Sequence, residues 1–129
     1  MDSNLAIDIE LFLDPTPPAA GSARRALHSA AIFDAVAEPD ALLLVSELVT
    51  NSIRYAHTPT EAAVELRATV YPDRVRVEVA DHGPGFEPRP RGPDQESRSG
   101  WGLYLVDQLS DRWGVSRTDG TAAWFEIDR

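Results

Sequence analysis

Apolar and polar residues alternate along several stretches of the chain, which is the pattern of β-strands with one buried face. The first stretch covers residues 5–13, where every second side chain is aliphatic. Residues 64–70 and 75–79 alternate in the same way on either side of Pro72-Asp73. A turn of this composition between two alternating runs predicts an antiparallel hairpin.

Three other stretches have the composition of helices. An alanine-rich segment from about residue 19 to residue 37 predicts the first helix. The second is predicted to begin near Pro39 and Asp40, which supply first-turn and capping chemistry, and to continue to about residue 56. The third is predicted over residues 100–109.

The C-terminal part predicts a second hairpin. Its strands are expected at residues 113–117 and 121–127, because Asp119-Gly120 between them is a strong turn signal. Five strands and three helices in this order predict an α+β fold with two layers. We expect a mixed, mainly antiparallel sheet with the helices on one face.

Length, composition and charge narrow the function. The 129 residues fit one domain, and no apolar run is long enough to span a bilayer. The acidic N-terminus does not resemble a secretory signal, so we expect a cytoplasmic protein. The net charge of −9 argues against a direct nucleic-acid binder. All 12 basic residues are arginine, which excludes the lysine-dependent P-loop, and the absence of cysteine excludes disulfides and thiolate chemistry.

The second predicted helix carries Glu47 and Asn51 on the side opposite its apolar stripe. Four residues apart, they are neighbours about 6 Å along the helix axis, where a carboxylate and an amide can address one ligand. Glu and Asn at this spacing alone are more often a solvated polar edge. Leu44 and Leu48 beside them indicate that this face of the helix is not simply exposed to solvent. The apolar stripe itself is expected at Leu42, Val45, Val49, Ile53 and Ala56.

Asp81 is the second candidate. It continues the parity of the apolar residues of its strand, so its carboxylate is expected to point toward the helix-covered face. Gly83 and Gly85 follow in a loop where a flat ligand can approach the backbone. Taken alone, this Asp-x-Gly-x-Gly pattern is more often a turn than a site.

A third signal is the segment Ser99-Gly100-Trp101-Gly102-Leu103 at the start of the last helix. Backbone N–H groups at a helix N-terminus, approached through glycines, suit a phosphate group, although a lone Gly-x-Gly is weak. The arginine- and proline-rich residues 86–99 before it fit a mobile lid or a disordered polar loop. The three histidines, His28, His57 and His82, show no metal-ligand spacing.

Together with Gly120-Thr121, these three motifs resemble, in order and spacing, the motifs of the GHKL superfamily, which includes gyrase, heat-shock 90 chaperones, histidine kinases and MutL. The resemblance covers nearly the whole chain and is greatest to small bacterial anti-sigma factor serine kinases of the RsbW and SpoIIAB type. It implies the Bergerat ATP-binding fold, with ATP and Mg²⁺ as cofactors.

The resemblance also implies residue roles. Asn51 would coordinate Mg²⁺, Glu47 would act as the general base, and Asp81 would bind the adenine amino group with Thr121 beside it. Gly83 and Gly85, which have no side chains, would leave space for the adenine ring. Gly100 and Gly102 would line the phosphates, and Trp101 and Leu103 would be among the other nucleotide-binding residues, although a packed aromatic is the simpler interpretation of Trp101.

In such kinases the partner is a STAS-type anti-anti-sigma protein that is phosphorylated on serine, and a sigma factor is sequestered in turn. The resemblance makes Arg24 and Arg25 candidate partner contacts, while exposed helix arginines are an equally good interpretation. A nucleotide-gated binding module without kinase activity and a histidine-kinase catalytic domain remain alternatives, and homodimer formation is left open.

Overall fold

The computed structural model describes residues 7–55, 64–81, 99–116 and 121–129. For residues 54–55 and 99–103 it describes the backbone alone. Within these ranges, none of the helices combines the length and apolar character that a membrane span requires.

Five strands form one sheet in the order β1-β2-β3-β5-β4. Every pairing between neighbours is antiparallel, so the expected mainly antiparallel sheet is confirmed without a parallel pair among the described strands. Tyr71 N–H donates to the Arg74 carbonyl at 2.8 Å and closes the predicted turn between β2 and β3. The strands are β1 (Ile7–Leu13), β2 (Val64–Val70), β3 (Arg74–Asp81), β4 (Arg112–Ser116) and β5 (Thr121–Asp128).

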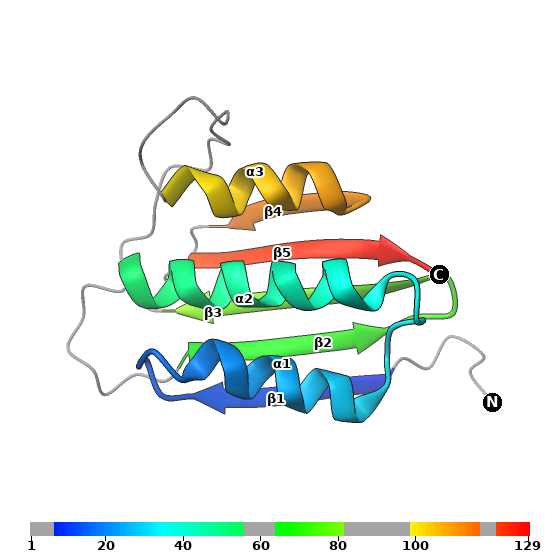
Figure 1. The fold of residues 1–129 in the computed structure, drawn as a ribbon, viewed down its shortest axis with the longest axis horizontal. Coiled ribbons are helices and arrows are strands. Elements are labelled where there is room, and N and C mark those ends of the chain that lie inside the picture. Colours follow the sequence, from blue (N-terminus) through cyan, green and yellow to red (C-terminus); the bar gives the residue numbers. More distant parts are fainter. Residues whose placement is uncertain (1–6, 56–63, 82–98, 117–120) are drawn as a thin grey trace.

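Three helices cover one face of this sheet (Figure 1), and none of the described helices lies on the other face. They are α1 (Ala19–Ala30), α2 (Glu38–Tyr55) and α3 (Ser99–Leu109). The central helix α2 contacts both other helices and strands β2, β3 and β5. We call the helix-covered side the inner face and the other side the outer face.

The core lies between the helices and the inner face. The inner side chains of β3 and β5 belong to it, and Val77 and Phe125, which are Cα partners across these strands, are both fully buried. From α2, the residues Ala41, Leu44, Val45, Leu48 and Val49 are buried. The two-layer α+β fold predicted from the sequence is therefore confirmed.

The first helix is shorter than predicted. It ends at Ala30 instead of continuing to about residue 37, because Ala31 adopts a left-handed conformation with φ 55° and its N–H donates to the His28 carbonyl. The Asp34 carboxylate then accepts the backbone N–H groups of Val36 and Ala37 at 3.0 and 2.8 Å. Such a turn competes with helical hydrogen bonding and redirects the chain into α2.

The apolar stripe of α2 is wider than the helical wheel predicts. Val45 and Val49 are buried as expected, and Leu44 and Leu48 on the neighbouring face are buried too. Leu42 and Ile53, which the wheel assigned to the stripe, are only half-buried. The reason is that α2 lies between α1 and α3 and is covered on its flanks as well as underneath.

The outer face is held together by charged residues around Glu126 on β5. Its carboxylate accepts hydrogen bonds from Arg112 at 2.7 Å and from Arg74 and Arg76 at 3.3 Å, which joins strands β3, β4 and β5. Burial alone would raise the pKa of the Glu126 carboxyl. The hydrogen bonds from Arg112, Arg74 and Arg76 have a larger effect in the opposite direction, so this pKa lies below its usual value. Asp128 extends the network as a second partner of Arg112.

Candidate functional site

Asp81 and Thr121 form a buried polar pair at one end of the central strands. Asp81 ends β3 and is 5% exposed, and it continues the inner face of that strand as the alternation predicts. Thr121 begins β5, is 3% exposed and is the direct Cα partner of Asp81. Since cross-strand partners point to the same face of a sheet, the carboxylate and the hydroxyl are neighbours beneath the helix layer.

Asn51 and Glu47 lie on the C-terminal half of α2. Asn51 is 3% exposed, so it is part of the interior and not of a solvated edge. Glu47, one turn earlier, is half-buried. Ser52, the residue after Asn51, is also 3% exposed, and its burial was not predicted from the sequence.

These residues come from elements that meet at the same end of the molecule. Figure 1 shows the C-terminal end of α2, the end of β3, the start of β5 and the start of α3 along the left edge of the view. Strands β3 and β5 both contact α2, and α2 contacts α3. The fold therefore collects the polar residues predicted from three separate sequence motifs in one region of the inner layer.

Two buried polar atoms in this region have no hydrogen-bond partner among the residues that the structure describes. Asn51 Nδ2 and Thr121 Oγ1 are both buried, and neither has a hydrogen-bond partner within the described ranges. Buried polar groups are almost always paired, and leaving one unpaired costs about 1–3 kcal/mol. A buried amide, a buried hydroxyl and a buried carboxylate fit a ligand that presents several hydrogen-bonding groups.

The remaining predicted site residues are only partly described. Gly100, Trp101, Gly102 and Leu103 lie in the first turns of α3, which begins at Ser99, so the glycine segment does open a helix. The structure describes only the backbone of these four residues. Gly83, Gly85, His57 and His82 also lie outside the described residues, as do residues 86–98 of the lid predicted over residues 86–99.

The helix residues suggested as partner contacts lie on the exterior of the helix layer. Arg24 donates a hydrogen bond to Ser46 Oγ on α2 at 2.5 Å, and Arg25 donates to Ser22 Oγ at 3.3 Å. Ser46 was not anticipated, because its role depends on how α1 packs against α2. His28 Nδ1 lies 3.1 Å from a carboxylate oxygen of Glu38, so this histidine connects α1 with the start of α2.

No group of three or more His, Asp or Glu side chains within the described ranges is arranged to hold a metal ion. The metal ligand predicted from the sequence is instead a single amide oxygen, that of Asn51. Mg²⁺ is commonly held in this way, by one or two protein oxygens together with phosphate oxygens of a substrate.

Comparison with known proteins identifies a family. The model of the histidine kinase-like ATPase domain matches residues 13–127. The serine-protein kinase RsbW of Bacillus subtilis is 34% identical over 93 residues, which are 63% of this chain and 58% of that protein. RsbW of Listeria monocytogenes (strain EGD-e) is 32% identical over 97 residues, covering 66% of this chain and 62% of the relative. The chain thus spans about 60% of the length of these curated relatives.

Solved structures show the same fold. The crystal structure of the RsbU and RsbW domains of a Mycobacterium tuberculosis protein superimposes with a TM-score of 0.73 at 21% identity, covering 95% of this chain and 33% of that one. The histidine kinase domain of a blue-light activated kinase from Erythrobacter litoralis gives a TM-score of 0.54 at 28% identity, covering 70% of this chain and 44% of that one.

Proposed function

Because the chain belongs to the histidine kinase-like ATPase domain family, we propose that it binds magnesium ATP where α2, β3 and β5 meet and acts as a protein serine kinase. The observation that carries this proposal is the buried set of Asp81, Thr121 and Asn51, in which the amide nitrogen and the hydroxyl lack partners within the described ranges.

Each residue has a distinct role in this proposal. The Asp81 carboxylate accepts a hydrogen bond from the adenine amino group, and Thr121 adds its hydroxyl beside it. The Asn51 side-chain oxygen is a ligand of the kind that Mg²⁺ prefers, and a half-turn of the amide exchanges its oxygen with the unpaired nitrogen. When bound, magnesium ATP supplies the phosphoryl group that is transferred.

Glu47 is the proposed general base. It lies one turn before Asn51 on α2 and is half-buried, so its carboxylate is held by the helix and is accessible from the surface. In the proposed reaction it would accept the proton of the substrate serine hydroxyl as that oxygen bonds to the γ-phosphorus, while the bond from this phosphorus to the bridging oxygen breaks and ADP leaves. The N-terminal turns of α3, with Gly100 and Gly102, offer backbone N–H groups to the phosphates.

The proposed partners follow from the RsbW relatives. We propose a STAS-type anti-anti-sigma protein as the phosphorylated substrate and a sigma factor as the protein that is regulated. Arg24 and Arg25, on the exposed side of α1, are the proposed contacts. The hydrogen bond from Arg24 to Ser46 holds this guanidinium against α2, the helix that carries Glu47.

A phosphorylation assay tests the kinase proposal. The protein is incubated with magnesium and ATP labelled at the γ-phosphate, together with the STAS-type proteins encoded near its gene. We expect phosphoserine on at least one of them. ATP binding without transfer to any of these proteins would instead favour a regulatory module that uses nucleotide only to set its affinity for a partner.

Glu47→Ala gives the residue-level test. It should bind ATP normally and transfer phosphate at least about 100-fold more slowly, which is the usual contribution of a general base. The matched control is Asp40→Ala, which removes an exposed carboxylate from the first turn of the same helix and should leave the rate unchanged. Equal rates in both variants would exclude Glu47 as the base.

A further inference from the structure

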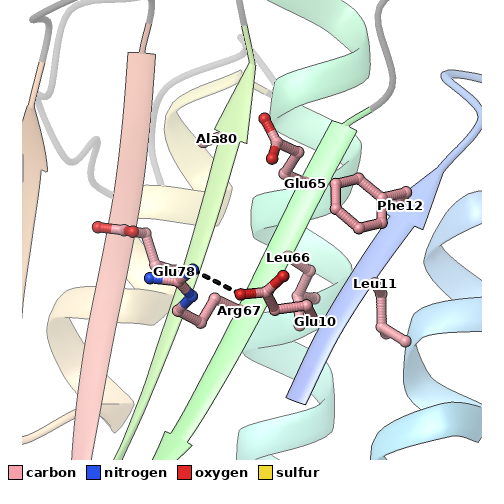
Figure 2. Close-up of a pocket in the computed structure, with 8 residues that line it drawn as sticks. All are labelled: Glu10, Leu11, Phe12, Glu65, Leu66, Arg67, Glu78 and Ala80. Atoms are coloured by element: carbon pink, nitrogen blue, oxygen red, sulfur yellow. Dashed lines mark hydrogen bonds and ion pairs between the residues drawn. The ribbon is translucent and has the colours of Figure 1, made fainter. Parts of the chain in front are cut away.

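The arginines of helix α1 differ from those of the sheet in their partners. On the sheet, Arg67 pairs with Glu10 at 2.5 Å (Figure 2), and three further arginines converge on Glu126. On α1, Arg24 and Arg25 donate to serine hydroxyls, and neither pairs with a carboxylate within the described ranges. Their positive charges are therefore not neutralised by an ion pair in that part of the chain.

Both guanidinium groups lie close to Gly21 on the same helix. A Cβ atom at this position would lie 3.5 Å from Arg24 Nη2 and 3.3 Å from Arg25 Nη1. Two positive charges that lie near one glycine add to the local electrostatic potential, although the chain as a whole has a net charge of −9. This part of the helix layer therefore attracts an anionic group.

Ser46 on α2 holds one of the two arginines against the neighbouring helix. Its Oγ accepts a hydrogen bond from Arg24 Nη1 at 2.5 Å and donates to the Leu42 carbonyl at 3.2 Å. The bond to Leu42 fixes the direction of the hydroxyl and turns a lone pair toward Arg24. Arg25 instead donates to Ser22 on its own helix at 3.3 Å. Arg24 is thus oriented before a ligand arrives, which lowers the entropy cost of binding.

The hydrogen bond between Arg24 and Ser46 lies at the level of the proposed general base. Ser46 directly precedes Glu47, so the two residues are about 1.5 Å apart along the axis of α2. Leu43 lies three residues before Ser46 and four before Glu47, the spacings at which side chains are neighbours on a helix surface. Leu43 is 40% exposed. An exposed aliphatic side chain is therefore a neighbour of both polar residues.

A protein with an acidic side chain is the occupant that this surface fits. Arginine attracts a carboxylate and can give it two parallel N–H hydrogen bonds. Leu43 fits an apolar side chain, which a protein surface provides and a free anion does not. A protein whose serine reaches Glu47 also covers Leu43, because these two side chains are neighbours on α2.

On the basis of the kinase function proposed above, we propose that Ser46 is a positioning residue for the protein substrate. It holds Arg24 where the guanidinium binds an aspartate or glutamate carboxylate of that substrate. Leu43 packs against an apolar side chain of the same protein. The substrate is thereby specified as a protein with an acidic and an apolar side chain close to the serine that is phosphorylated.

Steady-state kinetics test the positioning role. The substrate is the STAS-type protein that the phosphorylation assay identifies, and magnesium ATP is saturating. Ser46→Ala should raise KM for this protein about three- to tenfold and leave kcat and ATP affinity unchanged, because the hydroxyl affects only the binding of the protein. Ser46→Thr, which keeps the hydroxyl, should return KM to within about twofold of the wild-type value.

A double-mutant cycle shows whether Ser46 acts through Arg24. Arg24→Gln should raise KM about tenfold, and adding Ser46→Ala to it should raise KM no further. Leu43→Ala should raise KM about threefold. Arg67→Gln is the charge-matched control on the outer face and should leave KM unchanged. Calorimetry with ATP shows that each variant is folded.

Two results would overturn the positioning proposal and leave the kinase function standing. One is phosphoryl transfer with the same KM in the wild type, Ser46→Ala and Arg24→Gln. The other is an additive effect of the two substitutions, since Ser46 would then act independently of Arg24. Transfer to none of the STAS-type proteins by the wild type would contradict the kinase function and the positioning role together.

Discussion

The buried hydroxyl of Thr121 has no hydrogen-bond partner among the described residues, and we expect a ligand to provide one. The atom is buried at the start of β5 without a partner in the described part of the chain, next to the buried carboxylate of Asp81. Replacing it by the isosteric Thr121→Val removes the unpaired donor. We expect the free protein to be as stable as the wild type or more stable, and its ATP affinity to fall about two- to tenfold.

Thr69→Val is the matched control for this experiment. Thr69 is also a buried strand threonine, but its hydroxyl donates to Asp8 at 2.7 Å on the outer face. This variant should lose about 1 kcal/mol of unfolding free energy and keep its ATP affinity. Urea unfolding and calorimetry check both variants. A destabilised Thr121→Val with unchanged affinity would give Thr121 a structural role.

Residue-level prediction from the sequence succeeds for Asp81 and is incomplete for Asn51. The two-residue period of a strand assigns Asp81 to the inner face whatever the rest of the fold does, and the structure confirms it. The burial of Asn51 depends on whether other helices flank α2, which a wheel drawn for one helix does not contain. The spacing of Glu47 and Asn51 therefore predicted that the two side chains could share a ligand, but it did not predict that Asn51 is buried.

Strands β4 and β5 depend on a close contact between Gly114 and Trp124. A Cβ atom at position 114 would lie 2.9 Å from three atoms of the indole ring, which is closer than such atoms approach. Gly114→Ala forces the ring to move, and we expect it to cost about 1–3 kcal/mol of unfolding free energy. Thermal or urea unfolding measures the loss.

Gly21→Ala is the opposite case on α1. There the added Cβ would lie 3.3 Å from Arg25 Nη1 and 3.5 Å from Arg24 Nη2, which are the far ends of flexible side chains. Alanine favours a helix interior over glycine by up to about 1 kcal/mol, so this variant should be more stable than the wild type. Destabilisation of similar size in both glycine variants would show that the contact with Trp124 is not the cause.

Glu126 links three strands and makes the sheet sensitive to acid. Its folded pKa is lowered, so its contribution to stability is present above the pKa of the unfolded state and is lost as the pH falls through the folded value. We expect Glu126→Gln to lose about 1–2 kcal/mol at pH 7, since its arginine partners are partly exposed. At acid pH the variant and the wild type should converge in urea unfolding.

A Glu126→Gln deficit that stays the same from pH 7 to pH 3 would contradict this account. It would mean that the shape of the side chain, and not its charge, joins the strands. Arg25→Gln is a suitable comparison, because it removes a charge whose hydrogen bond stays within α1. Its stability should change little at any pH.

At the level of elements, the sequence predicted the strands better than the helix ends. Strands β2 and β5 begin where alternation begins, because their period is local. Helix α1 ends early because Ala31 turns left-handed and Asp34 binds two backbone N–H groups, and alanine-rich composition gives no warning of either. The hairpin pairing of β4 and β5 is confirmed, whereas its predicted turn at Asp119-Gly120 lies outside the described residues.

The whole molecule presents two surfaces with different chemistry. The inner layer holds a buried polar set at the end of α2, β3 and β5, and the order of the sequence motifs predicted this region. The outer face holds a hollow lined by residues of three strands, where Glu10 is ion-paired with Arg67 and Glu78 with Arg76. No local pattern revealed the hollow, because it depends on the register that aligns Glu10 with Arg67 and Glu78.

The central claim is that Asn51 and its neighbours form a magnesium-dependent ATP site. Calorimetry of ATP binding to the wild type and to Asn51→Ala, each with and without Mg²⁺, tests it most directly. We predict that Mg²⁺ strengthens binding to the wild type and has no such effect on the variant. Equal strengthening in both proteins would contradict the role of Asn51, and no heat of binding in the wild type would contradict the site itself.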